Sequence, residues 1–497
     1  MSQIEFLEFY KTHLKLEEED LKSFECSVDL PLPSAFRITP TKCTQMIRDK
    51  ISKYSFIHKV PFLTDVFSFE LKSQEPEYKE FIDFLVAQTD IGNIQRQEIV
   101  SFLPHLFMSL ESHHKVLETC ASPGSKTKNL LEIVKNGLLV SNDKTSSRVN
   151  ILISESSKKA TSNFIVSKCD AMNFPNFSCK FDRICCDVPC SGDGTYRKNP
   201  AILPKWKVQD GIALSNMQSK ILKRALELLA EDGILVYSTC SLNPIENEWV
   251  INSVVNDSDD YELLANFDFI QYESAFKDKI KVRKGITKFK YGNFEYDNPK
   301  LSKCFRILPH DQNTGGFFIT VIKKKKDMNT KEFVPLNKLN SAFVQLDETA
   351  MAKISKTCDV STCQSHFISF NSNFKNVFAV SDVCFDFLLN NPKLKIAYAG
   401  IKAFTESDLR KDVFRPKTAF LESQNIKCDI VLPLSDFKKL VLNRTVSLDE
   451  LVSKPDGLFT AEIEDIGNKV SGFSGGNKVF LYIDDNHRKA FTHLYFN

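Results

Sequence analysis

From about residue 113, two hydrophobic patterns alternate along the chain. Short apolar runs that pass into polar loops predict strands, and stretches with apolar residues three and four positions apart predict helices. Five strands are expected: HKVLETC (114–120), GLLVSND (137–143), NFIVSKCD (163–170), FDRICCDV (181–188) and GILVYSTC (233–240). Strands that alternate with helices indicate an α/β fold, with a mostly parallel sheet covered on both faces.

The clearest helical pattern is LSNMQSKILKRALELLAEDG (214–233). Its apolar face comprises Leu214, Met217, Ile221, Ala225 and Leu228. The pair Asp232-Gly233 predicts the end of this helix. Further along, FRILPHDQNTGGFFITVIKK (305–324) predicts two strands joined by an Asn-Thr-Gly-Gly turn, which gives an antiparallel hairpin at the edge of the sheet.

The chain on either side of this region is patterned differently. LPLPSAFRI (30–38) predicts a proline-bounded turn that enters a strand. Residues 91–110 predict a loop and then an amphipathic helix. The basic, polar run KKKKDMNTKEF (323–333) indicates a domain boundary, and the short strands and one helix after about residue 335 indicate a separate small α+β domain.

Composition narrows the class of protein. The 497 residues allow two or three domains, and 65 basic against 63 acidic residues leave any nucleic-acid binding to local basic patches. Neither a signal peptide nor a membrane span is expected, which favours a soluble intracellular protein. The 14 cysteines include no CxxC pair, and Cys358, Cys363 and His366 are interpreted as unrelated residues, so no metal site is expected.

Unusual residues gather at the predicted strand ends, where open parallel sheets bind ligands. The small-residue loop ETCASPGSK (118–126) follows the first strand and is neither a dinucleotide fingerprint nor a Walker phosphate loop. The next three strands end at Asp143, Asp170 and Asp187. One such acid alone is more often a turn or cap residue. Three of them favour a nucleoside-bearing cofactor, with Asp143 at ribose hydroxyls and Asp170 at an adenine edge.

Two thiols, Cys190 and Cys240, follow the fourth and fifth strands. They are compatible with a disulfide switch, a metal pair, or a nucleophile with a helper. Carbon 5 of cytosine becomes nucleophilic only after something adds to carbon 6, and a cysteine thiolate is well suited to that addition. An acid such as Asp187 would hold the pyrimidine ring nitrogen and stabilise the adduct.

Four motifs, LETCASPGSKT, KCDAMNFP, DVPCSGDGT and VYSTCSLNPIENE, occur here in the order found in a known family. The chain resembles the Nol/Nop/Sun family of RNA cytosine-5 methyltransferases. IGNIQRQE, PLPSAFRI and RILPHDQNTGGFF resemble its multisite tRNA-modifying branch. The resemblance is strong over about residues 1–325 and weaker over the C-terminal part, which is similar to a PUA-like domain.

The resemblance implies a Rossmann-like, class I S-adenosylmethionine-dependent methyltransferase. Its domains would be an N-terminal RNA-binding or substrate-positioning region (1–105), a catalytic domain (106–328) and a PUA-like α+β domain (335–497). It implies that Cys240 attacks carbon 6 and that Cys190 helps to release the methylated RNA. The residues implied to bind the cofactor or contact the target base are Cys120, Ala121, Ser122, Pro123, Gly124, Ser125, Lys126, Asp143, Asp170 and Asp187.

The chain departs from the family pattern at Glu118, where aspartate is usual, and at Ser122, where alanine is usual. We expect at most an altered affinity for the cofactor. Three other cysteines near the site, Cys169, Cys185 and Cys186, are interpreted as packing residues.

The basic run KDKIKVRKGITKFK (277–290), with Phe289 and Tyr291, is a candidate phosphate track with stacking rings. The implied partner is tRNA with a single-stranded or flipped-out cytosine, bound by a nuclear, monomeric protein without membrane or metal. Two alternatives stay open: the same chemistry on ribosomal RNA, and a non-catalytic RNA-binding scaffold. The scaffold is disfavoured because Cys240, Cys190 and Asp187 are all present.

Overall fold

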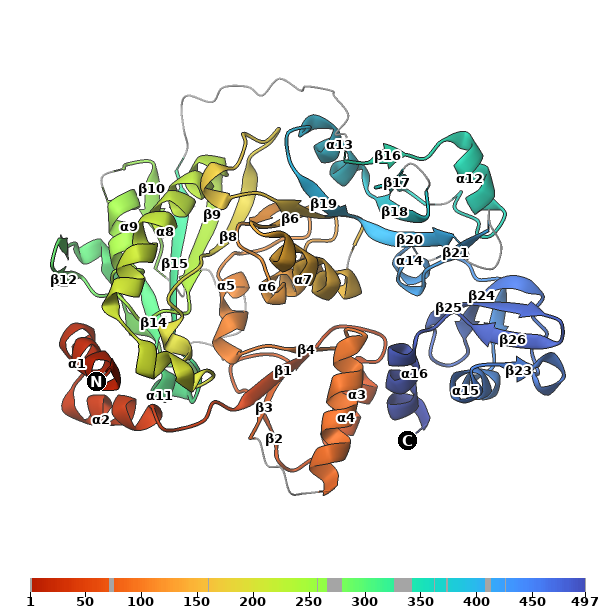
Figure 1. The fold of residues 1–497 in the computed structure, drawn as a ribbon, viewed down its shortest axis with the longest axis horizontal. Coiled ribbons are helices and arrows are strands. Elements are labelled where there is room, and N and C mark those ends of the chain that lie inside the picture. Colours follow the sequence, from red (N-terminus) through yellow and green to blue (C-terminus); the bar gives the residue numbers. More distant parts are fainter. Residues whose placement is uncertain are drawn as a thin grey trace.

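A computed structural model describes most of the chain (Figure 1). The described residues are 2–70, 76–159, 161–256, 258–265, 279–325, 342–361, 363–371, 374–406, 413–424 and 426–496. A large central sheet lies between an N-terminal region, drawn in red and orange, and a C-terminal region, drawn in blue. No helix of the described part is long and apolar enough to cross a membrane.

The central sheet confirms the predicted α/β fold. Its strand order is β11-β14-β15-β9-β8-β5-β6-β7-β19, and β10 pairs with β15. The five expected strands β5 to β9 form its parallel centre, and antiparallel strands flank them on both sides. The bounds are β5 Lys115–Glu118, β6 Leu138–Asp143, β7 Phe164–Lys168, β8 Phe181–Asp187, β9 Leu229–Thr239, β10 Tyr261–Leu263, β11 Arg283–Lys284, β14 Phe305–Ile307, β15 Phe317–Lys324 and β19 Ile396–Ala399.

Helices cover both faces of this sheet. Because the crossovers β5-α6-β6 and β8-α8-β9 run in opposite directions along the sheet, right-handed connections place α6 and α8 on opposite faces. The strand order reverses between β5 and β8, so a crevice is expected outside the carboxyl ends of these two strands. The helices of this region are α5 Leu103–Leu106, α6 Ser125–Ile133, α7 Ser146–Ser156, α8 Val208–Leu228, α9 Glu248–Val255 and α11 Pro309–Gln312.

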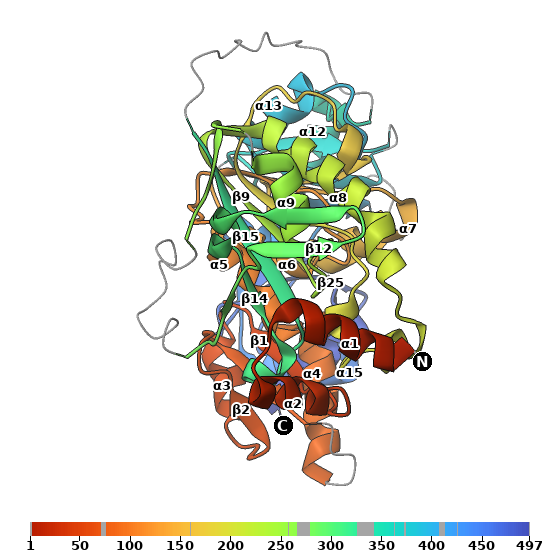
Figure 2. The ribbon, with the colours of Figure 1, turned by 90° about the vertical axis from the view of Figure 1, so that its left-hand side faces the viewer.

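The N-terminal region has two parts. Helix α1 lies near β12 (Figure 2) and α2 contacts α11, and a four-stranded antiparallel sheet, β2-β3-β1-β4, packs against α3 and α4. The strand expected after LPLPS is confirmed as β1. The bounds are α1 Ser2–Leu14, α2 Glu18–Ser27, β1 Ser34–Ile38, α3 Thr44–Ile51, β2 Ile57–Lys59, β3 Val66–Phe69, α4 Pro76–Asp90, β4 Ile94–Arg96, β12 Lys288–Tyr291 and β13 Phe294–Asp297.

The C-terminal region contains two five-stranded sheets with separate hydrophobic cores. Strand β19 leaves the first of these units and pairs with β7 of the central sheet. The last helix, α16, lies beside α4, and Gln88 of α4 donates a hydrogen bond to the carbonyl of Ala490 at 2.8 Å (Figure 1). The strands are β16 Val344–Gln345, β17 His366–Ser369, β18 Asn376–Val380, β20 Ile401–Glu406, β21 Phe414–Pro416, β22 Ile430–Leu432, β23 Val446–Ser447, β24 Gly457–Ile463, β25 Lys469–Gly475 and β26 Lys478–Leu481. The helices are α12 Glu348–Ser355, α13 Asp382–Asn390, α14 Thr418–Ser423, α15 Leu434–Asn443 and α16 Asp485–Phe491.

One sequence prediction about local structure is wrong, and two others are confirmed only in part. Helix α8 ends at Leu228 rather than at Asp232-Gly233, because Leu229 already pairs with Phe181 of β8 and Asp232 has a left-handed φ of 56° within β9. Residues 91–110 form β4 and two short helical turns instead of one amphipathic helix, since β4 pairs with β1. The β14–β15 hairpin exists, but α11 lies in its connection and β11 forms the edge beyond it.

Candidate active site

Two pockets open at the strand ends, where the order of the sheet reverses. The first, here called the thiol pocket, is lined by Cys240, Lys126 and Asp187. The second, here called the Asp143 pocket, is lined by Asp143 and Asp170. Cys120 lines both pockets, so the loop that follows β5 is the wall between them. The structure thus brings the predicted strand-end residues to one edge of the sheet.

The small-residue loop faces the thiol pocket more than the Asp143 pocket. Seven of its residues line the thiol pocket: Glu118, Cys120, Ala121, Ser122, Pro123, Ser125 and Lys126. Gly124 lines neither pocket. Its φ is 101°, and a Cβ there would lie 2.8 Å from the hydroxyl of Ser156 in α7. Glycine at position 124 is therefore required where α6 begins against α7, and not by contact with a ligand.

The carboxylates of the Asp143 pocket are already oriented by the protein. Asp143 accepts hydrogen bonds from the backbone N–H of Ser122 at 3.2 Å and of Lys144 at 2.8 Å, and Arg148 pairs with it at 3.0 Å. Lys144 lies 2.8 Å from Asp170. The two carboxylates are fixed at neighbouring strand ends and line one pocket, which fits a ligand rich in hydroxyl and amino donors.

A buried ion pair occupies the floor of the thiol pocket. Lys126 lies 2.7 Å from Asp187, whose other oxygen accepts a hydrogen bond from Ser238 at 2.6 Å. Burial acts to lower the pKa of Lys126, but Asp187 together with the neighbouring Cys185 and Cys240 outweighs it, and the net pKa is raised. Lys126 is therefore a firmly charged ammonium group beside the thiol of Cys240, in a site partly screened from water.

Glu118, which stands where the family pattern has aspartate, makes contacts that use its longer side chain. Its carboxylate is buried and accepts hydrogen bonds from Thr127 at 2.6 Å and Ser141 at 2.7 Å. Burial raises the pKa of Glu118 to about 7. The longer acid thus reaches across to β6 and the first turn of α6. It lines the thiol pocket and is absent from the lining of the Asp143 pocket.

The two predicted catalytic thiols lie side by side. The sulfur atoms of Cys190 and Cys240 are 3.3 Å apart, within the range of a hydrogen bond between thiols. The hydrogen bond to Cys240, together with burial, raises the pKa of Cys190 well above its usual value. Cys240 lines the thiol pocket and Cys190 does not. Cys240 is thus the thiol that faces a ligand, and Cys190 lies behind it as a neutral donor.

Two buried acids that the sequence analysis did not single out hold the thiol loops together. Asp193, from the Cys190 loop, accepts a hydrogen bond from the backbone N–H of Leu242 at 2.8 Å. Glu246, which follows the Cys240 loop, accepts one from the backbone N–H of Ser191 at 2.8 Å. Each loop therefore provides the acceptor for the other. Both acids lie inside quoted motifs, DVPCSGDGT and VYSTCSLNPIENE, but nothing in the letters tells which donors they meet.

Tyr10 of α1 joins the same network. Its hydroxyl donates to Asp193, as does the indole N–H of Trp206 at 3.1 Å. The first helix of the chain is consequently fixed to the base of the Cys190 loop. Cys185 and Cys186 are fully buried in β8, as expected for packing residues.

The interpretation of residues 277–290 as a phosphate track with stacking rings is wrong in most of its parts. Phe289 is only 3% exposed and stacks on Tyr296. The basic side chains meet acids of the same protein: Arg283 pairs with Asp311, Lys288 with Asp297 and Lys290 with Glu295. Lys277 lies outside the described residues. Acids of the neighbouring strand β13 pair with Lys288 and Lys290, and acids farther along the chain pair with Arg283, so this run is not a free basic surface.

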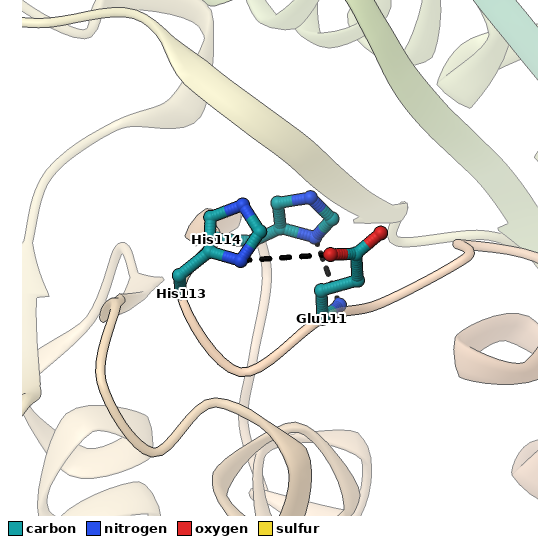
Figure 3. Close-up of side chains that lie close together, drawn as sticks. All are labelled: Glu111, His113 and His114. Atoms are coloured by element: carbon teal, nitrogen blue, oxygen red, sulfur yellow. Dashed lines mark hydrogen bonds and ion pairs between the residues drawn. The ribbon is translucent and has the colours of Figure 1, made fainter.

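Two clusters of histidine and acidic residues lie away from the strand ends. Glu111, His113 and His114 lie together in the loop before β5 (Figure 3). The backbone N–H of Glu111 donates to Nδ1 of His114 at 2.9 Å, and burial, with Arg183 nearby, lowers the pKa of His114. Asp20, His310 and Asp311 form the second cluster, around Arg283. These contacts order the loop before β5 and join α2 to the β14–β15 connection.

Comparison with known proteins assigns the central region. Residues 105–323 match the family model described as 16S rRNA methyltransferase RsmB/F. Those residues are similar to the RsmB/F methyltransferase family. The RsmB/F region, residues 105–323, contains all five parallel strands, the Asp143 pocket and both thiols. The thiol pocket also has a wall from the N-terminal region, formed by Leu32, Arg96, Gln97, Glu98 and Ser101.

Relatives extend beyond the RsmB/F region. The chain is 34% identical over 374 residues to the multisite-specific tRNA:(cytosine-C(5))-methyltransferase of Saccharomyces cerevisiae, covering 64% of this chain and 55% of the relative. It is 31% identical over 438 residues to a Schizosaccharomyces pombe protein with the same description, covering 72% of this chain and 64% of the relative. The chain thus spans about half to two thirds of these relatives.

A solved structure supports the fold. The crystal structure titled NSun6 from Pyrococcus horikoshii with SFG has a TM-score of 0.50 to this chain at 17% identity, covering 65% of this chain and 98% of the other. This likeness agrees with the Rossmann-like arrangement of the RsmB/F sheet.

Proposed function

We propose that the protein transfers a methyl group from S-adenosylmethionine to carbon 5 of cytosine in tRNA, through a covalent adduct of Cys240 with carbon 6. The observation that carries this proposal is the pair of thiols 3.3 Å apart beside a pocket floored by Lys126 and Asp187. The family assignment and the two yeast relatives support it. The tRNA substrate is taken from those relatives.

Each side chain of the thiol pocket has a role in this chemistry. Cys240 is the thiol that lines the pocket, and it forms the bond to carbon 6. Addition makes the ring nitrogen N3 more basic, and the Asp187–Lys126 pair, joined at 2.7 Å, provides a shared proton and a charged donor for it. After methylation, the carbon 5 proton leaves to water in the open pocket. The electron pair of the C6–S bond returns to Cys240, and Cys190, whose sulfur lies 3.3 Å away, is the proposed hydrogen-bond donor to it.

The Asp143 pocket is the proposed cofactor site. Its two oriented carboxylates fit ribose hydroxyls and an amino edge, and Cys120 gives it a common wall with the thiol pocket. S-adenosylmethionine bound there would supply an activated methyl group.

Replacing Asp143 with alanine should weaken cofactor binding about tenfold or more, because a charged acceptor of ribose hydroxyls is lost. RNA affinity should change little. Titration calorimetry with S-adenosylmethionine and a filter-binding assay with tRNA measure the two affinities. Asp182→Ala is the matched control. Asp182 lies at the N-terminal end of β8, opposite to the strand ends that carry the pockets, and accepts a hydrogen bond from the backbone N–H of Lys115. Equal cofactor affinity in both variants would place Asp143 outside the site.

The protein should label carbon 5 of cytosine when incubated with methyl-labelled S-adenosylmethionine and unmodified tRNA. Digestion to nucleosides identifies the product. Label in a ribose methyl group or in another base would refute the proposal. Naked ribosomal RNA is the parallel substrate, because the matched family model is named for 16S rRNA methyltransferases. Labelling of ribosomal RNA in preference to tRNA would support the proposed reaction but contradict tRNA as its substrate.

We further infer, from the resemblance alone, that the C-terminal region is PUA-like and assists RNA binding, that the N-terminal region positions RNA, and that the protein is nuclear and monomeric. Electromobility shifts with tRNA, light scattering and imaging of a tagged chain test these points.

A further inference from the structure

We propose that Glu246 is a positioning residue for Cys190, and that it acts on the release of methylated RNA and not on its capture. The inference rests on the proposed function, and in particular on Cys190 as the thiol that assists release. Glu246 is fully buried and does not line the thiol pocket, so it does not touch the target base.

Glu246 is the acceptor for four donors around the thiol loops. One of its oxygens accepts the backbone N–H of Ser191 at 2.8 Å and the side-chain amide of Gln218 at 3.0 Å. The other accepts the hydroxyls of Ser191 at 2.5 Å and Ser241 at 2.7 Å. A carboxylate can satisfy all four donors because it is an acceptor at both oxygens.

These donors hold Cys190 from both sides. Ser191 is its C-terminal neighbour and is bound to Glu246 directly. Gln218, in α8, donates to the carbonyl of Pro189, the N-terminal neighbour of Cys190, at 2.9 Å as well as to Glu246. The position of Cys190 in its loop therefore depends on this one carboxylate.

Cys240 is anchored by other contacts. Its carbonyl accepts a hydrogen bond from Gly194 at 3.0 Å, and the preceding residue, Thr239, is part of β9 and pairs with Phe318 of β15. The Thr239 hydroxyl donates to Asn247 at 2.6 Å. The Glu246 carboxylate contacts this loop through the hydroxyl of Ser241. Loosening Glu246 should therefore move Cys190 away while Cys240 stays at the strand end.

This asymmetry assigns Glu246 to one step. Attack on carbon 6 needs Cys240 in place. Release needs the C6–S bond to break, with its electron pair returning to the Cys240 sulfur and the carbon 5 proton leaving to water. A donor 3.3 Å from the departing sulfur stabilises the thiolate that forms, and a displaced Cys190 cannot provide it.

The test is Glu246→Gln, which keeps the shape but puts an NH₂ group where donors point. The first methyl transfer, followed in a single turnover, should stay within a few-fold of the unmodified protein. Steady-state turnover should fall roughly tenfold or more as release stalls. A denaturing gel with tRNA and S-adenosylmethionine should show a slow-migrating protein–RNA band, as expected for Cys190→Ala. Adding Glu246→Gln to Cys190→Ala should slow release no further, because both changes remove the same donor.

Glu248→Gln is the matched control. Glu248 is equally buried two residues later, but its carboxylate meets Arg306 at 2.8 Å and the backbone N–H of Ile286, and neither thiol loop. It should give no trapped band. A band in both variants, or an equal loss of capture and release in Glu246→Gln, would overturn the inference.

Two further outcomes are distinguishable. If Glu246→Gln does not fold, Ser191→Ala is the alternative variant, because it removes the Ser191 hydroxyl, one of the donors to the same carboxylate. It should give a weaker protein–RNA band, and no band would count against the role of Glu246. If Cys190→Ala gives no band although the protein methylates tRNA, the release role of Cys190 fails, and the role of Glu246 fails with it.

Discussion

Replacing Cys240 with alanine should abolish both methyl transfer and covalent attachment to RNA. Cys240 is the thiol that lines the pocket, and without it no bond to carbon 6 forms and carbon 5 stays unreactive. Loss of a nucleophile in a covalent enzyme lowers the rate by at least about 10³-fold. Methyl-labelled S-adenosylmethionine with tRNA measures the rate, and a denaturing gel measures the adduct.

The matched control is Cys179→Ala. Cys179 is also a partly buried free thiol of the catalytic region, but it lies in the loop before β8 and lines neither active-site pocket. It should retain full activity. Methyl transfer by Cys240→Ala at more than a few per cent of the normal rate would require a different nucleophile.

Replacing Cys190 with alanine should produce the opposite phenotype on the gel. Cys240 still attacks and methylation still occurs, but the donor 3.3 Å from the departing sulfur is lost. Release should slow by roughly 10²-fold or more, the range over which a positioned proton donor acts. The protein should then accumulate as a covalent complex with methylated RNA, visible as a slow-migrating band.

The double variant Cys190→Ala/Cys240→Ala separates this result from its rival. The band should disappear, because the trapped bond is to Cys240. Lower activity of Cys190→Ala without any band would mean that Cys190 only packs its loop. A band in Cys240→Ala would reverse the roles of the two thiols.

The sequence predicts the strand ends well, for a physical reason. Apolar runs stop where the chain leaves the sheet, and parallel strands expose these ends at one edge, so Asp143, Asp187 and Cys240 are found together. Short sequence signals for the ends of helices are less reliable. Asp232-Gly233 has the chemistry of a helix end, yet pairing of Leu229 with β8 places it inside a strand.

Contacts between residues distant in sequence are beyond prediction from one chain. In the sequence, the basic run at 277–290 has the composition of a binding surface. In the structure, Arg283 of this run pairs with Asp20 and Asp311, which lie far from it along the chain. The role of Glu246 likewise depends on Gln218 and Ser191, which only the fold brings near. The roles proposed for Cys190 and Cys240 come from family resemblance, and the structure adds their spacing and their unequal access to the pocket.

The pairing of β19 with β7 has a consequence for how the chain can be divided. Strand β7 is hydrogen-bonded on one side to β6 and on the other to a strand contributed by residues 396–399. A chain cut after residue 325 would keep both pockets and both thiols but would leave β7 as an open edge. The apolar segment Phe164–Lys168 would then present unpaired N–H and C=O groups to other molecules, which is a template for strand-to-strand aggregation. The C-terminal region therefore covers an edge of the central sheet that would otherwise be open to pairing with another strand.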